Sequence, residues 1–157
     1  MWWCWPLNWA AGWGSSKTIL EKIIAPADYY RPWWNLERFY DKSIFLPKIN
    51  NESPSPVNED YKRRITNVTN LALFKWNDDR TIHPKESSWF GYFNEYHEVI
   101  KLKDSPDYIN DLIGLRTLDE AGKLYFYSDA GDHMYFPQSY IQNYLIPLLL
   151  DQTPMPS

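Results

Sequence analysis

The chain has 157 residues, enough for one ordinary domain, and 44% of them are hydrophobic, as in globular proteins. A net charge of −4 without a basic stripe excludes a nucleic-acid footprint, which needs a clustered positive field. The single cysteine, Cys4, excludes an internal disulfide and a cysteine-bound zinc, and we expect no metal and no cofactor. No apolar stretch of about 18 residues occurs, so no membrane span is expected, and the first residues lack the pattern of a signal peptide.

The start of the chain is rich in tryptophan. Residues 1–15 contain five of the nine tryptophans and no lysine or arginine to meet anionic lipid headgroups, which disfavours a membrane anchor. We interpret them as a segment that packs against another part of a larger protein, or as a non-native leader. Aromatic residues make up 18% of the chain, which fits a lipid-binding lid as well as an ordinary aromatic-rich core.

Short helical and irregular patterns alternate in the next part of the chain. We expect a helix capped by Ser16, an extended segment over Tyr29–Trp34 and a short helix over Asn35–Tyr40. An irregular, proline-containing loop is expected over Asn50–Asn58, and Asp60–Thr66 is expected to be helical.

Two Asn-x-Ser/Thr triplets are candidate glycosylation sites. They begin at Asn51 and Asn67, and Pro54 weakens the first. Both are compatible with the secretory route.

An apolar run over Leu71–Trp76, broken only by Lys75, predicts a strand that is buried on both faces of a parallel sheet. Asn77, Asp78 and Asp79 end the run abruptly. Acidic side chains at the carboxyl end of a central strand lie where α/β proteins place their sites, so this turn is the first candidate for chemistry.

The C-terminal part predicts two further strands and three helices. We expect a short strand over Glu98–Leu102, a helix that begins at Ser105-Pro106, and a strand over Leu124–Tyr127. The segment Thr117–Glu120 has the pattern of a capping box, and Gly122 is a fitting stop for its helix. The turn Ser128–Asp132 then leads to His133. A last helix is expected to begin near Pro137 and to kink or end at Pro147. One face of this helix is expected to carry Tyr140, Ile141, Tyr144, Leu145 and Leu148.

An aspartate after one strand and a histidine after the next have the chain order of the acid and base in the α/β-hydrolase triad. The nucleophile of that fold lies on a Gly-x-Ser-x-Gly elbow, and this sequence contains no such motif. The nearest candidate is Gly12-Trp13-Gly14-Ser15-Ser16, which lacks the glycine after serine.

From about Leu7 to Leu150 the chain resembles the C-terminal half of the palmitoyl-protein thioesterases, lysosomal enzymes that remove fatty acyl groups from cysteine. The blocks SIFLPKINNE, HPKESSWFGYF, IGLRTLDEAGKLYF and GDHMYF carry the resemblance, in matching order and spacing. It implies the C-terminal part of an α/β-hydrolase fold with a lid insertion and an incomplete sheet. It also implies that Asp79 is the triad acid and His133 the base. Asp78 is the alternative acid, although strand alternation points it to the opposite face.

The resemblance further divides the chain by role. It implies a lid or acyl-groove insertion over residues 16–66, hydrolase core over 67–150 and a tail over 151–157. His83 and His97 are interpreted as surface residues. In the resembled family an aspartate is common at the position of His83. Six lid residues are candidates for contact with the acyl chain, with simple packing of the lid on the core as the alternative: Trp33, Trp34, Phe39, Tyr40, Phe45 and Leu46.

Three functional hypotheses follow. The first is a partial palmitoyl-protein thioesterase that holds the acid and base but is inactive alone, because it lacks the nucleophile. The second is action together with a serine-bearing half in trans, and the third is a non-catalytic lipid-binding or interaction module. The resemblance implies a palmitoyl-cysteine peptide or acyl chain as partner and the lysosome or secretory pathway as location.

Overall fold

The computed structural model describes residues 31–52 and 56–150, so the helix expected after Ser16 lies outside the described residues. The helices are α3 (Leu36–Lys42), α4 (Leu46–Ile49), α5 (Glu59–Thr66), α6 (Pro106–Ile109), α7 (Leu115–Glu120), α8 (Gln138–Tyr140) and α9 (Ile146–Leu149). The strands are β1 (Leu71–Trp76), β2 (Tyr92–Phe93), β3 (Val99–Ile100) and β4 (Leu124–Asp129). Two 3₁₀ turns, η2 (Lys85–Trp89) and η3 (Leu102–Asp104), and one π turn, η4 (Ile141–Leu145), complete them.

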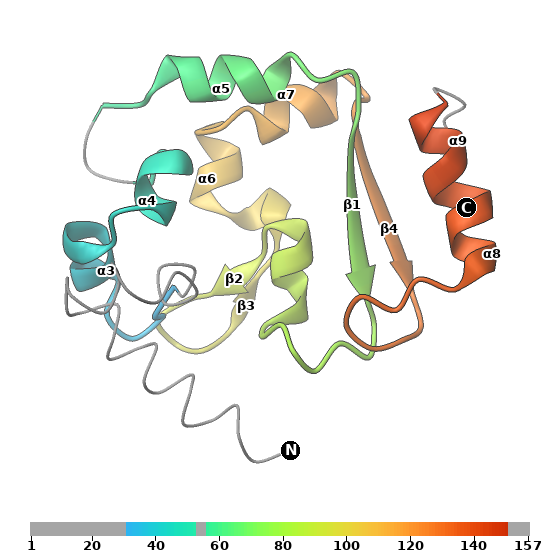
Figure 1. Cartoon of the computed structure of the whole chain (residues 1–157). Coiled ribbons are helices and arrows are strands. Elements are labelled where there is room, and N and C mark those ends of the chain that lie inside the picture. The colour runs from blue at the N-terminus through green and yellow to red at the C-terminus, as the bar shows by residue number, and fades with distance from the viewer. Residues whose placement is uncertain (1–30, 53–55, 151–157) are drawn as a thin grey trace.

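Strands β1 and β4 form a parallel pair at the centre of this arrangement (Figure 1). The pairing runs from Leu71 opposite Leu124 to Trp76 opposite Asp129. The structure therefore confirms the predicted parallel strands, with the bounds of β1 as expected and β4 two residues longer than expected. Both carboxyl ends reach the same edge of the pair, where the loops of the candidate site begin.

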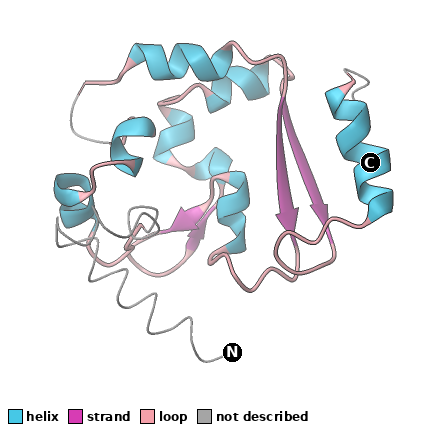
Figure 2. Ribbon diagram, in the orientation of Figure 1, coloured by secondary structure: helices cyan, strands magenta, loops and turns pink. Residues whose placement is uncertain are grey.

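Helical segments cover both faces of the β1–β4 pair, as Figure 2 shows. On one face Leu73 and Leu124 join a core with residues of η3, α7 and the preceding loop. On the other face Trp76 and Tyr127 pack with Tyr140 of the C-terminal helix. Side chains alternate between the two faces of a strand, so covering both faces explains why apolar residues occupy successive positions in β1. Full burial is confirmed only for Leu73 and Trp76, because the rest of β1 is half-buried.

Helix α7 begins earlier than the sequence predicts. Its N-cap is Gly114, with φ of 88°, so Thr117 lies inside the helix and the predicted capping box is wrong. A Cβ on Gly114 would lie 2.3 Å from Cγ2 of Thr66, which means that glycine also permits the close approach of α5. The Thr117 backbone N–H donates instead to Asp111, 3.1 Å away.

The C-terminal helix continues through Pro147 instead of ending there. Proline lacks the N–H that an α-helix uses and crowds the preceding turn, and the wider π turn of η4 lies immediately before α9. Tyr140, Tyr144 and Leu148 pack on the core, as expected. Ile141 is 37% exposed and does not, because its side chain leaves that face.

The smaller elements follow local signals in part. Ser105 caps α6, as the sequence predicts, and Asn35, expected as the first residue of its helix, instead caps α3; each accepts a backbone hydrogen bond. The helix expected over Asp60–Thr66 is α5. The strand expected near Glu98 is β3, but its antiparallel partner β2 and the helix α4 are not anticipated. In the described ranges, no helix is both long and apolar enough to cross a membrane.

Candidate active site

Two loops leave the carboxyl ends of β1 and β4 side by side. The parallel pairing continues past the strands, since Asn77 N–H donates to Asp129 O at 2.8 Å and Asp78 N–H donates to Gly131 O at 3.0 Å. The Asp78 carboxylate in turn accepts from Gly131 N–H at 3.0 Å. These hydrogen bonds fix the loop that carries Asp79 against the loop that carries His133.

Asp79 is the buried acid of this pair of loops. Its side chain is only 2% exposed. One carboxylate oxygen, Oδ1, accepts hydrogen bonds from the backbone N–H groups of Thr81 at 2.8 Å and Ile82 at 3.0 Å. Burial raises the pKa of Asp79, but the hydrogen bonds from Ile82, His133 and Thr81 outweigh it and hold the pKa below its usual value. Asp79 is therefore a carboxylate at neutral pH.

His133 completes the pair. Its Nδ1 lies 2.9 Å from the other Asp79 oxygen, Oδ2. An ionised carboxylate only accepts hydrogen bonds, so Nδ1 carries the proton and Nε2 is left as the basic atom of the neutral ring. The His133 side chain is 36% exposed, so the ring is open to an approaching group while its partner is buried. This is the arrangement of an oriented general base.

The alternative acid, Asp78, has a different partner. Its carboxylate binds Gly131 N–H, whereas the hydrogen bond to His133 comes from Asp79. The Asp79 carboxylate, and not that of Asp78, thus lies within hydrogen-bond distance of His133, and Asp78 serves to join the loops.

A pocket of about 410 Å³ lies next to the Asp79 loop. Thr81 and Ile82, whose backbones bind the Asp79 carboxylate, contribute to its lining. The rest comes from the segment before α3, from α4 and from the region η2 to α7, in a mixture of apolar, aromatic and charged residues. Such a concave, largely apolar space next to the loop of Asp79 has the character of a ligand site.

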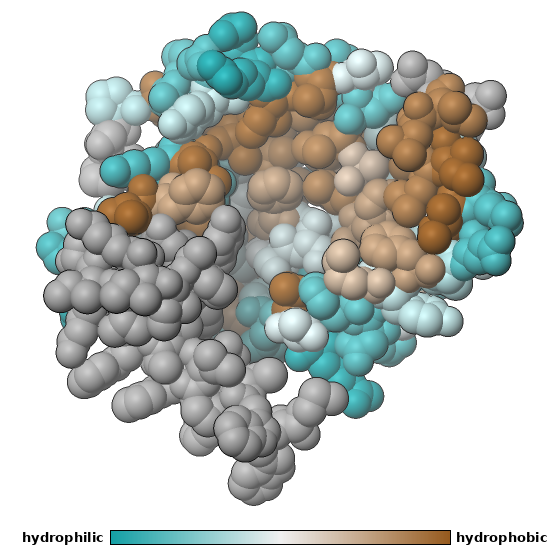
Figure 3. All heavy atoms as spheres, viewed as in Figure 1, coloured by the Kyte–Doolittle hydropathy of each residue, from teal (hydrophilic) through white to brown (hydrophobic). Residues whose placement is uncertain are grey.

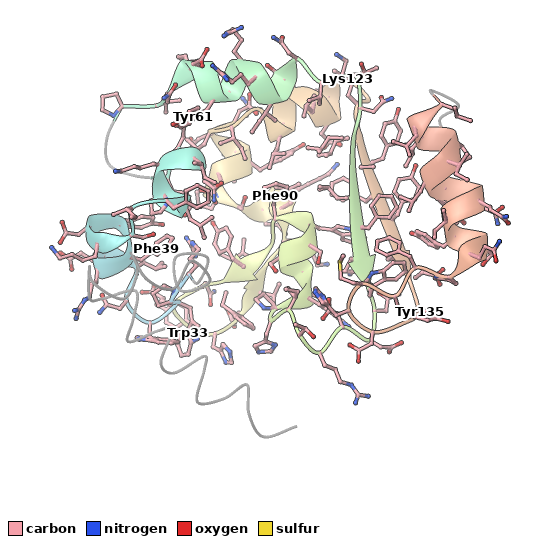
Figure 4. The ribbon with its side chains drawn as sticks, in the orientation of Figure 1. Trp33, Phe39, Tyr61, Phe90, Lys123 and Tyr135 are labelled. Carbon is pink, nitrogen blue, oxygen red and sulfur yellow. The ribbon has the colours of Figure 1, made fainter. Side chains whose placement is uncertain are left out.

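The six candidate acyl-contact residues are dispersed in the structure. Trp33 and Leu46 line the pocket. Phe39 is 1% exposed and belongs to the packing of α3, on which Figure 4 places it. The Tyr40 hydroxyl accepts a hydrogen bond from Arg31 at 3.0 Å. The remaining two, Trp34 and Phe45, are 52% and 38% exposed.

His83 and His97 are exposed, as expected, but they also belong to the rim of the pocket. The His97 ring stacks on Trp33, with centroids 4.7 Å apart, and lies 4.3 Å from the Phe93 ring. The position of the two histidines at the pocket could not be predicted from sequence, because Trp33 lies far from strands β2 and β3 along the chain.

A cluster of ionisable side chains that the sequence analysis did not anticipate forms another part of the pocket. Arg31 Nε donates to the Glu52 carboxylate at 3.2 Å, and the Arg31 guanidinium lies 4.0 Å from the centroid of Tyr92. Asp107 also lines the pocket, and the Tyr92 hydroxyl acts to lower its pKa. We call Arg31, Glu52, Tyr92 and Asp107 the ionic wall. No group of His, Cys, Asp and Glu among the described residues has the arrangement of a metal site.

Comparison with known proteins identifies the family to which this arrangement belongs. The palmitoyl protein thioesterase family model matches residues 7–133. The chain belongs to the palmitoyl-protein thioesterase family. Membership implies an α/β-hydrolase fold, with which the parallel β1–β4 pair and its covering helices agree.

Individual relatives resemble the chain over most of its length. Palmitoyl-protein thioesterase 1 of Caenorhabditis elegans is 34% identical over 135 residues, which cover 85% of this chain and 45% of the relative. Palmitoyl-protein thioesterase 3 of Dictyostelium discoideum is 35% identical over 140 residues, covering 85% and 48%. Lysosomal thioesterase PPT2-B of Xenopus laevis is 36% identical over 127 residues, covering 79% and 44%. The chain therefore spans a little under half the length of these relatives.

Proposed function

We propose that the chain carries the acid and base of a palmitoyl-protein thioesterase, which hydrolyses fatty acyl thioesters on protein cysteines. The observation that carries the proposal is the hydrogen bond between Asp79 and His133 at the carboxyl ends of adjacent parallel strands. Family membership supplies the reaction class, since the relatives are named as thioesterases.

In the proposed reaction His133 Nε2 takes the proton of a serine hydroxyl as its oxygen attacks the thioester carbonyl. The imidazolium then returns the proton to the leaving cysteine thiolate. Asp79 remains ionised, holds the ring by Nδ1 and stabilises its positive charge. Water, deprotonated by the same nitrogen, releases the fatty acid from the acyl-enzyme.

The nucleophile of this scheme is not supplied by a motif in the chain. The 157 residues contain no Gly-x-Ser-x-Gly sequence, so we propose that the chain alone does not form an acyl-enzyme. A serine-bearing half in trans would complete the triad. We further propose that residues 16–66 are the lid and that the chain acts in the lysosome or secretory pathway, in keeping with its lysosomal relatives.

The pocket is the proposed site of the acyl chain. Its apolar side chains are adjacent in the fold to the loop of Asp79, and Trp33 and Leu46, two of the six acyl candidates, line it. Thr81 and Ile82 join the two sites, because their N–H groups bind Asp79 while the residues also line the pocket. An acyl group held there would extend away from the proposed reaction centre.

A chimera tests the acid–base pair independently of the missing serine. Residues 67–150 replace the matching part of the Caenorhabditis elegans relative, and hydrolysis of a palmitoyl thioester is measured. We expect activity, with a loss of about 10⁴-fold in kcat on His133→Ala or Asp79→Asn. Asp104→Asn is the matched control, because this exposed aspartate on η3 lies outside the pocket lining and away from His133. Full activity of the His133→Ala chimera contradicts the assignment.

The unmodified chain provides the second test. Purified residues 1–157 should show no turnover above the His133→Ala variant. A lipid-binding module is the competing function, favoured by the pocket itself, and it predicts that fatty alcohols bind equally well when both Asp79 and His133 are replaced by alanine.

A further inference from the structure

The pocket has two chemically different parts. The residues that could accompany a hydrocarbon chain are Leu46, Ile82, Pro84, Leu102, Ile113 and Leu115, and the ionic wall supplies the charged part. Asp107 lies on α6, which Figure 1 shows on the other side of β2 and β3 from the loop that follows β1. Thr81 and Ile82 of the Asp79 loop and Asp107 of α6 therefore line the same pocket from different elements.

Asp107 is the unbalanced charge of the ionic wall. Arg31 pairs with Glu52, and the second oxygen of Glu52 accepts from Asn50 Nδ2 at 3.0 Å, so these two charges compensate each other. Asp107 forms no ion pair within the described ranges, and Arg31 and the Tyr92 hydroxyl favour its charged form only in part. At neutral pH the wall thus carries one net negative charge toward the pocket.

We propose that Asp107 limits how far an acyl chain extends into the pocket and is a specificity-determining residue for acyl length. The inference rests on the proposed function, since it requires the acyl chain to enter this pocket. Each methylene transferred from water to apolar surroundings strengthens binding about fourfold. A methylene that covers an ionised carboxylate without a cationic partner displaces the water that solvates it, which is unfavourable. The gain per methylene should therefore stop at Asp107.

The pKa of Asp107 supports the same conclusion. Burial, followed by the neighbouring Glu52 carboxylate, raises its pKa to about 6, and Arg31 and the Tyr92 hydroxyl offset only part of this rise. These are the ionisable groups that affect Asp107, from the segment before α3, the loop after α4 and strand β2. The protein thus already solvates this carboxylate poorly before any ligand covers it.

Binding of n-alkanols of increasing length to the whole chain tests the inference without requiring catalysis. Dissociation constants are measured by calorimetry at about pH 7.5, where Asp107 is ionised. We expect affinity to rise about fourfold per methylene up to a limiting length and then to level off. In Asp107→Leu the rise should continue for two further methylenes, which makes the longer alkanols bind on the order of tenfold tighter than to the wild type.

Three variants make the outcome specific. Asp104→Leu changes an exposed aspartate on neighbouring η3 and should keep the wild-type limiting length. Asp107→Asn is nearly isosteric and removes the charge without adding apolar surface, so it should lengthen the limit even if Asp107→Leu fails to fold. Leu46→Trp fills the pocket and should abolish binding, which shows that the alkanols occupy this space.

Acid pH provides an independent readout. At about pH 5 Asp107 is protonated, so the wild-type limiting length should increase, while that of Asp107→Asn should not change. His83 and His97 line the same pocket and are retained in both proteins, so any change that they cause would appear in both. Equal limiting lengths in all variants at both pH values overturn the inference about Asp107 but do not contradict the proposal that acyl chains bind in this pocket. Alkanol binding that is absent, or insensitive to Leu46→Trp, overturns the proposed acyl pocket as well.

Discussion

The Asp78 carboxylate accepts a hydrogen bond from Gly131 N–H at 3.0 Å and thereby joins the loop of the candidate acid to the loop of the candidate base. Asp78 N–H donates to Gly131 O in return, so the two residues form a reciprocal pair. The geometry of Asp79 and His133 depends on this contact, although neither residue takes part in it.

Asp78→Ala should therefore weaken the site without removing it. We expect kcat of the chimera to fall about tenfold to 100-fold, less than for Asp79→Asn, since loosening the loops misplaces the ring without changing its tautomer. Stability should fall by about 1 kcal/mol. Kinetics and urea unfolding measure the two effects. Asp129→Ala is the control, because among the described residues its carboxylate accepts a hydrogen bond only from the N–H of Ala130, the next residue. An equal loss in both variants would refute the proposed joining function.

Acid should remove the stability that Asp79 contributes. Its pKa is lower in the folded chain than in the unfolded chain, so the contribution is present above about pH 4 and is lost as pH falls through the folded value. Asp79→Asn should consequently lose less stability than the wild type on acidification. Urea unfolding at several pH values between about 3 and 6 measures this difference, with Asp104→Asn as the control. Parallel curves for wild type and Asp79→Asn would contradict the prediction.

Asp107→Asn should stabilise the chain at neutral pH. The pKa of Asp107 is raised in the folded chain to about 6, so the folded state holds this proton more tightly than the unfolded state, and stability is lost as pH rises through that range. The asparagine side chain of the variant stays neutral as pH rises. Because the side chain is partly open to water, we expect a gain on the order of 1 kcal/mol at about pH 7.5 and a smaller one at about pH 4. Thermal unfolding at both pH values checks it, and the same gain at each would be evidence against titration.

The two glycosylation candidates should behave differently. Asn51 is buried, its Nδ2 donates to Leu112 O at 2.8 Å, and its Oδ1 accepts from Asn58 N–H at 2.9 Å, so its amide is part of the packing. Asn67 is exposed at the end of α5, as is Thr69. In secreted protein from eukaryotic cells we expect a glycan at Asn67 and none at Asn51.

Mass spectrometry after enzymatic deglycosylation measures the occupancy of each triplet. Asn51→Ala should cost about 2–3 kcal/mol in protein made in bacteria, because buried backbone groups lose their partners and alanine is strained at the Asn51 φ of 55°. Asn67→Gln should cost little in the same protein. A glycan on Asn51 of the folded protein would show that this asparagine is not buried as described.

The purified chain should self-associate. The described sheet that carries the candidate site has only two strands, and a parallel pair leaves unpaired backbone groups at its edges. Apolar side chains also gather on the C-terminal helix at the right of Figure 3, where Leu149 is 84% exposed. Analytical ultracentrifugation over a range of concentrations measures the effect. A monomer that melts cooperatively and binds no hydrophobic dye would instead favour a self-sufficient binding module.

The parts of the fold that were predictable from sequence are those with strong local signals. The bounds of β1 follow from an apolar run that ends at three polar residues, and the start of α6 follows from Ser105 and Pro106. The pairing of Asp79 with His133 was predictable because the family resemblance placed both residues in matched blocks. Local pattern was misleading at α7, where the left-handed Gly114 begins the helix before the apparent capping box.

The ionic wall could not be predicted, because it joins side chains that are distant in sequence. Arg31, Glu52 and Asp107 come from three separate segments, and each is unremarkable beside its neighbours. Strands β2 and β3, with two residues each, are too short to show a period. Tertiary contacts, and not local preference, determine both features.

The parallel pairing of β1 with β4 has a consequence for the order of folding. Parallel strands need a crossover, and the residues that meet as acid and base are 54 positions apart. Closing a loop of that length costs conformational entropy before the contacts between the strands offset it, and this slows folding. Helices α5 and α6, whose hydrogen bonds are local, can form earlier. Asp79 and His133 are thus brought together late in folding, when β1 and β4 pair. A polypeptide that is still emerging from the ribosome therefore lacks the hydrogen bond between them.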